Sequence, residues 1–473
     1  MTLTAASVAL LLVGASCRTE PSGASCDVGR VETCVCESGA SGARSCMDDR
    51  RWSACLCGVP VDGGFDDAWR DGGAPFEERM DGGDPMDARD GAMTNDDGVD
   101  AVVREAGTDD VGDVVDAAEP FVSGWDPRIG PLGLDQPAVS LLVDGSTVVL
   151  GGRFRHVRGE SANLLARFDP ATGAFTPVPN TLRGLSPSAN AITRWQGSLV
   201  VGGSFVGGIA SQSGGDFAVL GGGLETPGFV FALVPDSARL WVGGNFVTSD
   251  HQSAHVAAWT AGGWQSLGDE PDRVVLALAR DGNTLWIGGD FVFQAGTPPL
   301  DLFGIGRFDL GVNRWTSVGA GATAGSGTAG RATVSAIVST PDFIYAGGDF
   351  DRMDGRAVGR IARWRRATAR WEALPPGVGV RGAVQAMAYD AGKLYVAGLF
   401  NQAGGVAAAN IAVFDTARES WSTLGDGVDG TVSGTGPTQV VDIAVSGRDI
   451  YVAGDFANAG GRPSPGFAHY RMP

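Results

Sequence analysis

A short hydrophobic run that ends in Gly-x-Phe recurs from residue 148 to the end of this chain. Seven copies occur: VVLGGRF (148–154), LVVGGSF (199–205), LWVGGNF (240–246), LWIGGDF (285–291), IYAGGDF (344–350), LYVAGLF (394–400) and IYVAGDF (450–456). Units that recur at such intervals are typical of β-propellers and solenoids, in which each unit buries its apolar face against its neighbours. The repeat therefore constrains the fold more than any other feature of the sequence.

Each copy is the second of four short apolar segments. The first segment lies about ten residues upstream, as in 138–143, and the third lies downstream, as in 163–169. The fourth begins with an aromatic residue in most copies: Phe175, Trp264, Trp315, Trp371 and Trp421. Short segments separated by Gly-containing turns predict strands, so we expect an all-β fold of four-stranded antiparallel blades. In the second copy Phe217 fits the fourth strand, and the third strand is predicted to be reduced or lost around 207–215.

The two ends of the repeat region complement each other. Trp125 lies 27 residues before Gly152 with no complete unit ahead of it, and the chain stops at Pro473 before a fourth strand could begin in the last copy. We therefore expect the segment near Trp125 to supply the outer strand of the last blade, which closes a seven-bladed β-propeller over residues 122–473. The alternative is an open β-solenoid, which needs no donated strand.

The repeat also resembles a known type of unit. Its fullest copy is LYVAGLFNQAGGVAAANIAVFDTARESWSTLG (394–425). This pattern resembles the delta-60-type, kelch-like repeats of bacterial secreted propellers and is similar to the repeats of the fungal cortical-marker protein Rax2. The resemblance covers about residues 122–473. It implies a propeller that serves as a surface-exposed binding or scaffolding module, and it brings no catalytic residue.

The N-terminus has the features of an export signal. Residues 5–15 (AASVALLLVGA) are apolar but too few to span a bilayer as a helix, and Cys17 follows shortly after them. The sequence around Cys17 resembles the lipobox of bacterial lipoproteins, which implies a signal peptide over 1–16 and a lipidated Cys17. Membrane attachment through that lipid would place the protein at the outer membrane or cell surface of a Gram-negative bacterium. An ordinary cleaved signal, followed by secretion, is the alternative.

All seven cysteines lie within the first 57 residues. Apart from Cys17 they are Cys26, Cys34, Cys36, Cys46, Cys55 and Cys57. An even number in a short exported segment predicts disulfides, although the pairing stays open and a zinc site is the rival. Residues 17–58 also resemble a small Cys-rich module found next to lipoprotein signals in Gram-negative surface proteins.

The acidity of the chain is concentrated in one segment. The formal charge is −19, and residues 59–120 contain 19 acidic and four basic side chains. Such a composition cannot build a core, so 59–121 is predicted to be a disordered acidic linker. The repeat region is close to neutral and lacks the basic patch that nucleic acid requires, so we expect no nucleic-acid partner and a monomer.

The sequence offers little for chemistry. No cysteine lies beyond Cys57, and we find no nucleophile elbow, phosphate loop or Rossmann fingerprint, so no catalytic residue, metal or cofactor is predicted. The pair His251 and His255 leaves zinc as a minor alternative. Asn245, Asp290, Asp349 and Asp455 recur at one position of the repeat, where Asp and Asn most simply stabilise a turn.

The turns after the motif's Phe differ between copies and are expected to share a face with the connections between blades. Variable loops on a constant frame favour binding. The candidate binding-face residues are Arg153, His156, Arg158, Asn245, Asp290, Asp349, Asp351, Arg352 and Asp455. We therefore expect a lipid-anchored, surface-displayed, non-catalytic module for a protein or glycan ligand. The alternative is a carbohydrate-active propeller enzyme of the cell envelope, which needs two non-repeated carboxylates facing the axis.

Overall fold

The computed structural model describes residues 121–473 except 226–227, 297–298, 325–331, 378 and 435, together with the backbone of 31–35, 41–45 and 56–57. The chain divides into two units, Met1–Met80 and Asp81–Pro473. In the first unit β1 (Val31–Val35), β2 (Ser41–Ser45) and β3 (Leu56–Cys57) form one antiparallel sheet. The predicted signal peptide 1–16, the lipidation of Cys17, the cysteine pairing and the acidic linker (up to residue 120) all fall outside the described residues and side chains.

Seven antiparallel sheets of one design make up most of the described part of the second unit, each with four strands along its main path. Sheet 1 contains β5 (Ala138–Asp144), β6 (Thr147–Gly152), β9 (Leu165–Asp169) and β10 (Ala174–Pro177). Sheet 2 contains β11 (Ala189–Trp195), β12 (Ser198–Gly203), β13 (Ile209–Ser213) and β14 (Asp216–Val219). Sheet 3 contains β15 (Phe229–Pro235), β16 (Leu240–Val247), β17 (Ala254–Thr260) and β18 (Gly263–Gln265).

The later sheets follow the same order. Sheet 4 contains β19 (Val275–Asp281), β20 (Thr284–Ala295), β21 (Leu300–Asp309) and β22 (Arg314–Thr316). Sheet 5 contains β24 (Thr333–Ser339), β25 (Phe343–Asp349), β28 (Ile361–Arg365) and β29 (Arg370–Ala373). Sheet 6 contains β30 (Val380–Asp390), β31 (Lys393–Ala403), β33 (Ile411–Asp415) and β34 (Ser420–Thr423). Sheet 7 contains β36 (Gln439–Ser446), β37 (Asp449–Asp455), β40 (Phe467–Arg471) and β4 (Gly124–Trp125).

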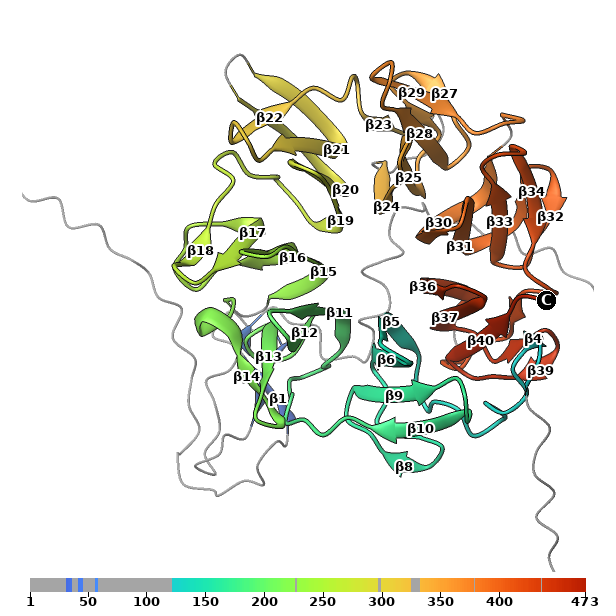
Figure 1. The fold of residues 1–473 in the computed structure, drawn as a ribbon. Coiled ribbons are helices and arrows are strands. Elements are labelled where there is room, and N and C mark those ends of the chain that lie inside the picture. The colour runs from blue at the N-terminus through green and yellow to red at the C-terminus, as the bar shows by residue number, and fades with distance from the viewer. Residues whose placement is uncertain are drawn as a thin grey trace, which may run out of the picture. The chain divides into compact units, whose positions relative to one another are not determined.

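The sheets are arranged radially, with the first strand of each nearest the centre (Figure 1). The first strands contact one another in chain order, β5 to β11 and onward to β36, and β36 also contacts β5. Radial four-stranded antiparallel sheets are the blades of a β-propeller. The prediction of an all-β propeller fold is therefore confirmed.

The second Gly of each motif is required by a bulge in the neighbouring first strand. In sheet 1, Ala138 pairs with Gly152 and Ser140 pairs with Gly151, so one residue of β5 is left without a partner, and the same register shift occurs in all seven sheets. A Cβ at the second Gly would overlap a carbonyl oxygen beside the bulge, that of Pro137 in sheet 1 and of Thr333 in sheet 5. Because backbone cannot move aside cheaply, only Gly fits.

The first position of the Gly pair faces the next sheet. A Cβ at Gly243 would lie 2.8 Å from the side chain of Val275, and one at Gly288 would lie 2.8 Å from Val334. Here the obstacle is a side chain rather than backbone. Sheets 6 and 7 accordingly carry Ala397 and Ala453 at this position, and both are fully buried.

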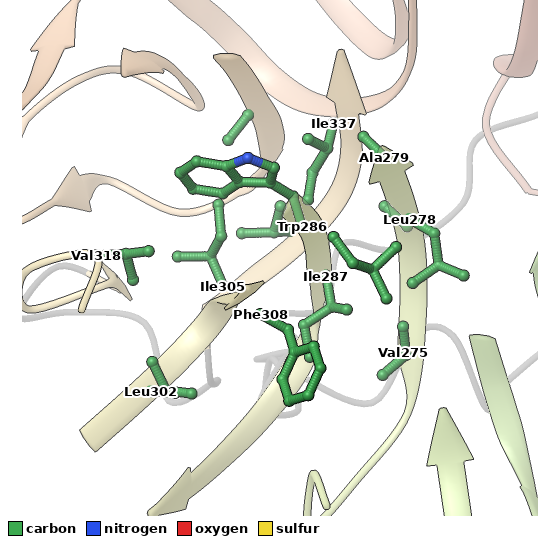
Figure 2. Close-up of a cluster of buried hydrophobic side chains, with 14 of the residues drawn as sticks. Val275, Leu278, Ala279, Trp286, Ile287, Leu302, Ile305, Phe308, Val318 and Ile337 are labelled. Carbon is green, nitrogen blue, oxygen red and sulfur yellow. The ribbon is translucent and has the colours of Figure 1, made fainter. Parts of the chain in front are cut away.

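The core lies between adjacent sheets. The motif's Phe is buried in every copy, at 0–5 % exposure. The largest cluster joins sheets 3, 4 and 5, and part of it, centred on Trp286, includes Ile337 from sheet 5 (Figure 2). Aromatic pairs link strands three and four: Phe308 pairs with Trp315 at 5.1 Å between ring centroids, and Phe414 pairs with Trp421 at 5.1 Å. Such cross-strand ring pairs fix strand register as well as burying area.

Two details of the predicted blades are wrong. The third strand of sheet 2 is neither reduced nor lost: β13 has five residues and pairs with both β12 and β14. Its sequence signal is weak because three of the five residues of IASQS are polar, but Ile209 and Ala210 are buried in the core and hold the strand together with its backbone pairing. The strand-four aromatics are also not the first residues of their strands, since Trp371 follows Arg370 and Trp421 follows Ser420.

The segment near Trp125 forms the outer strand of sheet 7, as predicted. Trp125 pairs with Tyr470, and their rings lie 5.1 Å apart. Next to this strand, Asp126 is held in a fully buried position. Its carboxylate accepts hydrogen bonds from Arg128 Nη2 at 2.6 Å and contacts His469 Nδ1 at 2.9 Å. The chain entering the repeat region is thus tied to the last strand of the protein.

The same polar cluster extends across sheet 7 to sheet 1. His469 Nε2 lies 2.8 Å from Asp449 Oδ1, and Arg128 donates to the carbonyl oxygens of Pro170 and Ala171, both at 2.9 Å. Burial raises the pKa of Asp126, but the hydrogen bonds from Arg128 and His469 outweigh it and lower that pKa to about 2. The carboxylate is therefore charged at neutral pH and binds the first residues of the fold to its last strand.

Asp442 forms a second link between sheets 7 and 1. At the residue after the bulge, the first strands carry Ala in sheets 2 to 6, Ser140 in sheet 1 and Asp442 in sheet 7. The Asp442 carboxylate accepts hydrogen bonds from the backbone N–H of Leu141 at 2.7 Å and of Ile443 at 2.8 Å. Burial nevertheless raises its pKa to about 6.

Candidate functional site

Four of the turns that follow the motif's Phe share one backbone design. They are β7 (His156–Val157) with β8 (Glu160–Ser161), β26 (Arg352–Met353) with β27 (Arg356–Ala357), the end of β31 with β32 (Val406–Ala407), and β38 (Asn458–Ala459) with β39 (Arg462–Pro463). Each tip has two residues with positive φ: Arg158-Gly159, Asp354-Gly355, Gly404-Gly405 and Gly460-Gly461. Positive φ at both positions gives a type I′ turn, which suits a two-residue hairpin.

The inner side of these hairpins is as constant as their backbone. Val157, Met353, Ala403 and Ala459 occupy one position and are at most 2 % exposed. The backbone bond that closes the hairpin also repeats, from Ala162 N to Arg155 O at 2.7 Å in sheet 1 and from Val358 N to Asp351 O at 3.0 Å in sheet 5. The hairpins are therefore ordered extensions of the sheets rather than irregular loops.

The hairpins lie against the connections between sheets. β23 (Ala322–Thr323), in the connection from sheet 4 to sheet 5, pairs with β26, and β35 (Val428–Asp429), in the connection from sheet 6 to sheet 7, pairs with β38. In sheet 1 the equivalent contact is a bridge between Leu134 and Val157. The prediction that these turns share a face with the connections is confirmed.

The outward positions of the same hairpins differ between sheets and are exposed or half-buried. They are Arg155, His156, Glu160 and Ser161 in sheet 1; Asp351, Arg352, Arg356 and Ala357 in sheet 5; Asn401, Gln402, Val406 and Ala407 in sheet 6; and Ala457, Asn458, Arg462 and Pro463 in sheet 7. One frame thus carries four different sets of side chains on one face. We refer to these positions as the hairpin face.

Three predicted binding residues belong to the sheet 1 hairpin or its entry. His156 Nδ1 lies 2.9 Å from Asp135 Oδ2, and Arg158 Nη2 donates to the carbonyl oxygen of Arg128 at 3.3 Å. Arg153 is exposed, and its backbone N–H donates to Pro137. The His156 and Arg158 side chains thus make contacts within the protein, although His156 remains accessible.

The Asp and Asn residues that recur after the Gly pair are spread over four sheets and do not form one site. Asn245 is exposed on β16. Asp290 contacts Arg273 Nη2 at 3.1 Å, and Asp349 pairs with Arg360. Asp455 accepts hydrogen bonds from the backbone N–H of Val432 and Ser433. The three acidic residues hold neighbouring segments in place.

The two remaining candidates lie side by side on the sheet 5 hairpin. Asp351 Oδ1 is 3.4 Å from Arg360 Nη2, and Arg352 Nη1 donates to the carbonyl oxygen of Gly355 at 2.9 Å. Both side chains remain partly accessible on the hairpin face.

His251 and His255 do not act as a pair. His251 Nδ1 lies 2.7 Å from Glu225 Oε1 and the ring is exposed, whereas His255 lies in β17. Burial lowers the pKa of His255. In the part of the chain that the structure describes, no three His, Cys, Asp or Glu side chains are grouped so that they could hold a metal ion. The same part contains no helix long and apolar enough to cross a membrane.

The central strands present few groups for acid–base chemistry. A glycosidase needs two carboxylates placed on either side of a glycosidic bond. At the two bulge positions of the described first strands, Asp442 is the one carboxylate, and it is engaged with Leu141 of the neighbouring sheet. The raised pKa of Asp442 does not supply the second carboxylate that a glycosidase needs.

A cleft that the sequence did not predict lies between sheets 4 and 5. It has a volume of about 500 Å³ and is lined by Arg307, Ser317, Asp354, Arg356, Trp364 and Arg370, among others. The sequence holds one hint of it, six arginines between 356 and 370. Some of these arginines pair with carboxylates distant in the sequence, Arg363 with Glu419 and Arg366 with Asp281, so spacing alone could not show which of them stay unpaired.

Comparisons with known proteins add little beyond the fold. No protein-family model matches the chain, and no curated protein does. The chain is similar in structure to the computationally designed Ika8 protein (14 % identity, TM-score 0.44, covering 72 % of this chain and 98 % of that one). It is also similar to U3-55K (10 %, 0.46, 75 % and 100 %) and to YCF48 solved with a D1 peptide (13 %, 0.46, 74 % and 96 %). The resemblance to delta-60-type and Rax2-like repeats stays a prediction.

Proposed function

We propose that this protein is a lipid-anchored, surface-displayed binding module whose residues 122–473 form a closed seven-bladed propeller. Three observations support the closed ring: the contact of β36 with β5, the pairing of β4 with β40, and the polar cluster around Asp126. A ring that joins both ends of the repeat region leaves no open sheet edge at its seam.

The hairpin face carries the functional part of the proposal. Its buried positions and backbone bonds repeat in sheets 1, 5, 6 and 7, while its outward positions change from one sheet to the next. A position that only stabilises the blade would be expected to repeat with the blade. Outward side chains that differ on a rigid frame suit recognition of a ligand, because the backbone that carries them is already ordered and loses little conformational entropy on binding. The ligand class is a protein or a glycan.

An exchange of outward side chains tests this role. In the full chain, Arg155, His156, Glu160 and Ser161 are replaced by Gly or Ser, with Val157 and Ala162 kept, and the equivalent positions of sheets 5 to 7 are treated likewise. We expect glycan-array or purified-partner binding to fall at least tenfold while the melting temperature stays within a few degrees. The matched control changes Ser146 and Gln196, which lie in exposed turns at the opposite ends of sheets 1 and 2. Binding that survives the hairpin exchange and is lost in the control would refute the assignment.

The lipid anchor rests on the sequence around Cys17 and has its own test. We expect the wild-type chain to incorporate labelled palmitate in a Gram-negative host and to fractionate with membranes. Cys17→Ser should abolish both, and globomycin should cause the precursor to accumulate. Cys26→Ser is the control, because it removes a cysteine without touching the lipobox-like segment. Labelling that persists in Cys17→Ser would contradict the anchor.

A further inference from the structure

Three arginine side chains line the cleft between sheets 4 and 5. Arg307 comes from β21 of sheet 4, Arg370 from β29 of sheet 5 and Arg356 from β27 of the hairpin, so three strands each contribute one guanidinium group. Asp354 is the one carboxylate in the lining, and its Oδ1 already accepts a hydrogen bond from the backbone N–H of Ala320 at 2.9 Å. The lining therefore has an excess of positive charge.

The neighbouring arginines of sheet 5 are neutralised, which sets these three apart. Ion pairs join Arg360 to Asp349, Arg363 to Glu419 at 2.7 Å, Arg365 to Glu372 at 2.6 Å and Arg366 to Asp281. By contrast, Arg307, Arg356 and Arg370 form no ion pair with any residue that the structure describes. The carboxylates of this region are distributed so that the cleft keeps its charge.

Arg307 adds an independent observation. Its Nε atom is shut off from solvent and has no hydrogen-bond partner among the described residues, although burying an unpaired donor is unfavourable. Its guanidinium carbon lies 5.8 Å from the ring centroid of Trp286, which is 2 % exposed. The ring restrains the guanidinium group beside the cleft. A restrained guanidinium group that pairs with no carboxylate suits an anionic ligand.

We propose that this arginine cleft binds the oxyanion group of an acidic saccharide. The inference rests on the proposed binding function and names a ligand class for it. Guanidinium groups bind carboxylate and sulfate oxygens through paired N–H donors, so several arginines can hold one such group. The volume of about 500 Å³ lies in the range of small-ligand sites, and Trp364 and the Ser317 hydroxyl give an apolar wall and a polar contact suited to a sugar ring. The oxyanion is a uronate carboxylate or a sulfate ester.

Binding measurements on the full chain distinguish these two sources. The probes are an oligogalacturonate, its methyl-esterified neutral form and a sulfated oligosaccharide of similar length, followed by isothermal calorimetry at two salt concentrations. We expect one acidic probe to bind, the neutral probe to bind at least tenfold more weakly, and added salt to weaken binding.

Substitutions locate the site. Arg370→Gln and Arg307→Gln should each weaken binding at least fivefold, and the double variant should abolish it. Arg314→Gln is the matched control, since Arg314 is exposed on β22 of the same sheet but does not line the cleft, and it should change binding less than twofold. Arg370 is exposed, so its variant reports on binding even if Arg307→Gln disturbs folding.

Three outcomes would overturn the inference: no binding of either acidic saccharide, equal binding by wild type and Arg370→Gln, or preference for an acidic phosphopeptide over both saccharides. The hairpin-exchange experiment distinguishes failure of the arginine-cleft proposal from failure of the proposed binding function. If a ligand is lost on hairpin exchange while no acidic saccharide binds, only the arginine cleft is refuted. If neither experiment detects a ligand, the binding function fails as well.

Discussion

Replacing Asp126 by Asn should weaken the junction between the first and last strands of the fold. The Asp126 side chain is fully buried and receives three hydrogen bonds from Arg128, from the backbone N–H at 3.0 Å, from Nε at 2.8 Å and from Nη2 at 2.6 Å. His469 Nδ1 contacts it at 2.9 Å. Asn keeps the shape of this side chain but removes the charged acceptor of Arg128 and of His469 Nδ1.

The size of the effect follows from the titration of the carboxyl group. A pKa lowered from 3.8 to about 2 corresponds to about 2.5 kcal/mol of stability. Because the folded pKa is the lower one, this contribution is fully present above about pH 4 and is lost as the pH falls through about 2. Removing one partner of a buried pair costs roughly 3–5 kcal/mol. We therefore expect Asp126→Asn to destabilise the protein by about 3 kcal/mol at pH 7.

The assay is urea unfolding of the wild type and Asp126→Asn at several pH values. The difference in the free energy of unfolding should be constant above about pH 5 and should shrink to under about 1 kcal/mol at pH 2. Asp426→Asn is the control, because Asp426 is exposed, and its effect should stay below about 0.5 kcal/mol at every pH. A difference at pH 7 no larger than that of the control would refute the account of how the two ends are joined.

Two further substitutions test the seam and the motif. The pKa of Asp442 is raised to about 6, so ionisation of this carboxyl group lowers the free energy of unfolding as the pH rises from about 4 to about 6. Over that window the wild type should lose about 3 kcal/mol relative to Asp442→Ala. A difference in urea unfolding that does not change with pH would contradict the burial of this carboxyl group. Gly348→Ala should destabilise by more than about 3 kcal/mol because its Cβ meets the carbonyl oxygen of Thr333. Gly347→Ala should cost about 1 kcal/mol because only side chains, those of Val384 and Met387, must yield, and equal melting temperatures for the two variants would disprove this distinction.

The repeating parts of the fold could be predicted because packing forces them to repeat. The bulge opposite Gly348 leaves no room for a Cβ atom. The same steric conflict occurs at the second Gly of the other six copies, so Gly recurs there in the sequence. The outer strand at Trp125 was predictable for a related reason, since a missing strand at one end of the chain requires a spare one at the other. By contrast, β13 has only two apolar residues, the buried Ile209 and Ala210, and so short an apolar segment gives a weak signal in the sequence.

The candidate sites were less accessible to sequence reasoning. The recurrence of Asp349 and Asp455 does not reveal their partners, which are specific to each sheet: Arg360 in one case and the backbone near Ser433 in the other. The arginine cleft depends on which guanidinium groups lack a carboxylate, and Asp281 reaches Arg366 across 85 residues of sequence. A local sequence pattern cannot show that an arginine lacks a carboxylate partner, because that partner can come from any part of the chain.

The central claim, that the propeller is a binding module whose outward hairpin side chains carry specificity, is tested most directly by a glycan array probed in parallel with the full chain and its hairpin-exchange variant. We predict that the wild type binds a restricted set of glycans and that the variant, folded to the same melting temperature, loses that set. An identical binding profile for the two proteins would contradict the claim.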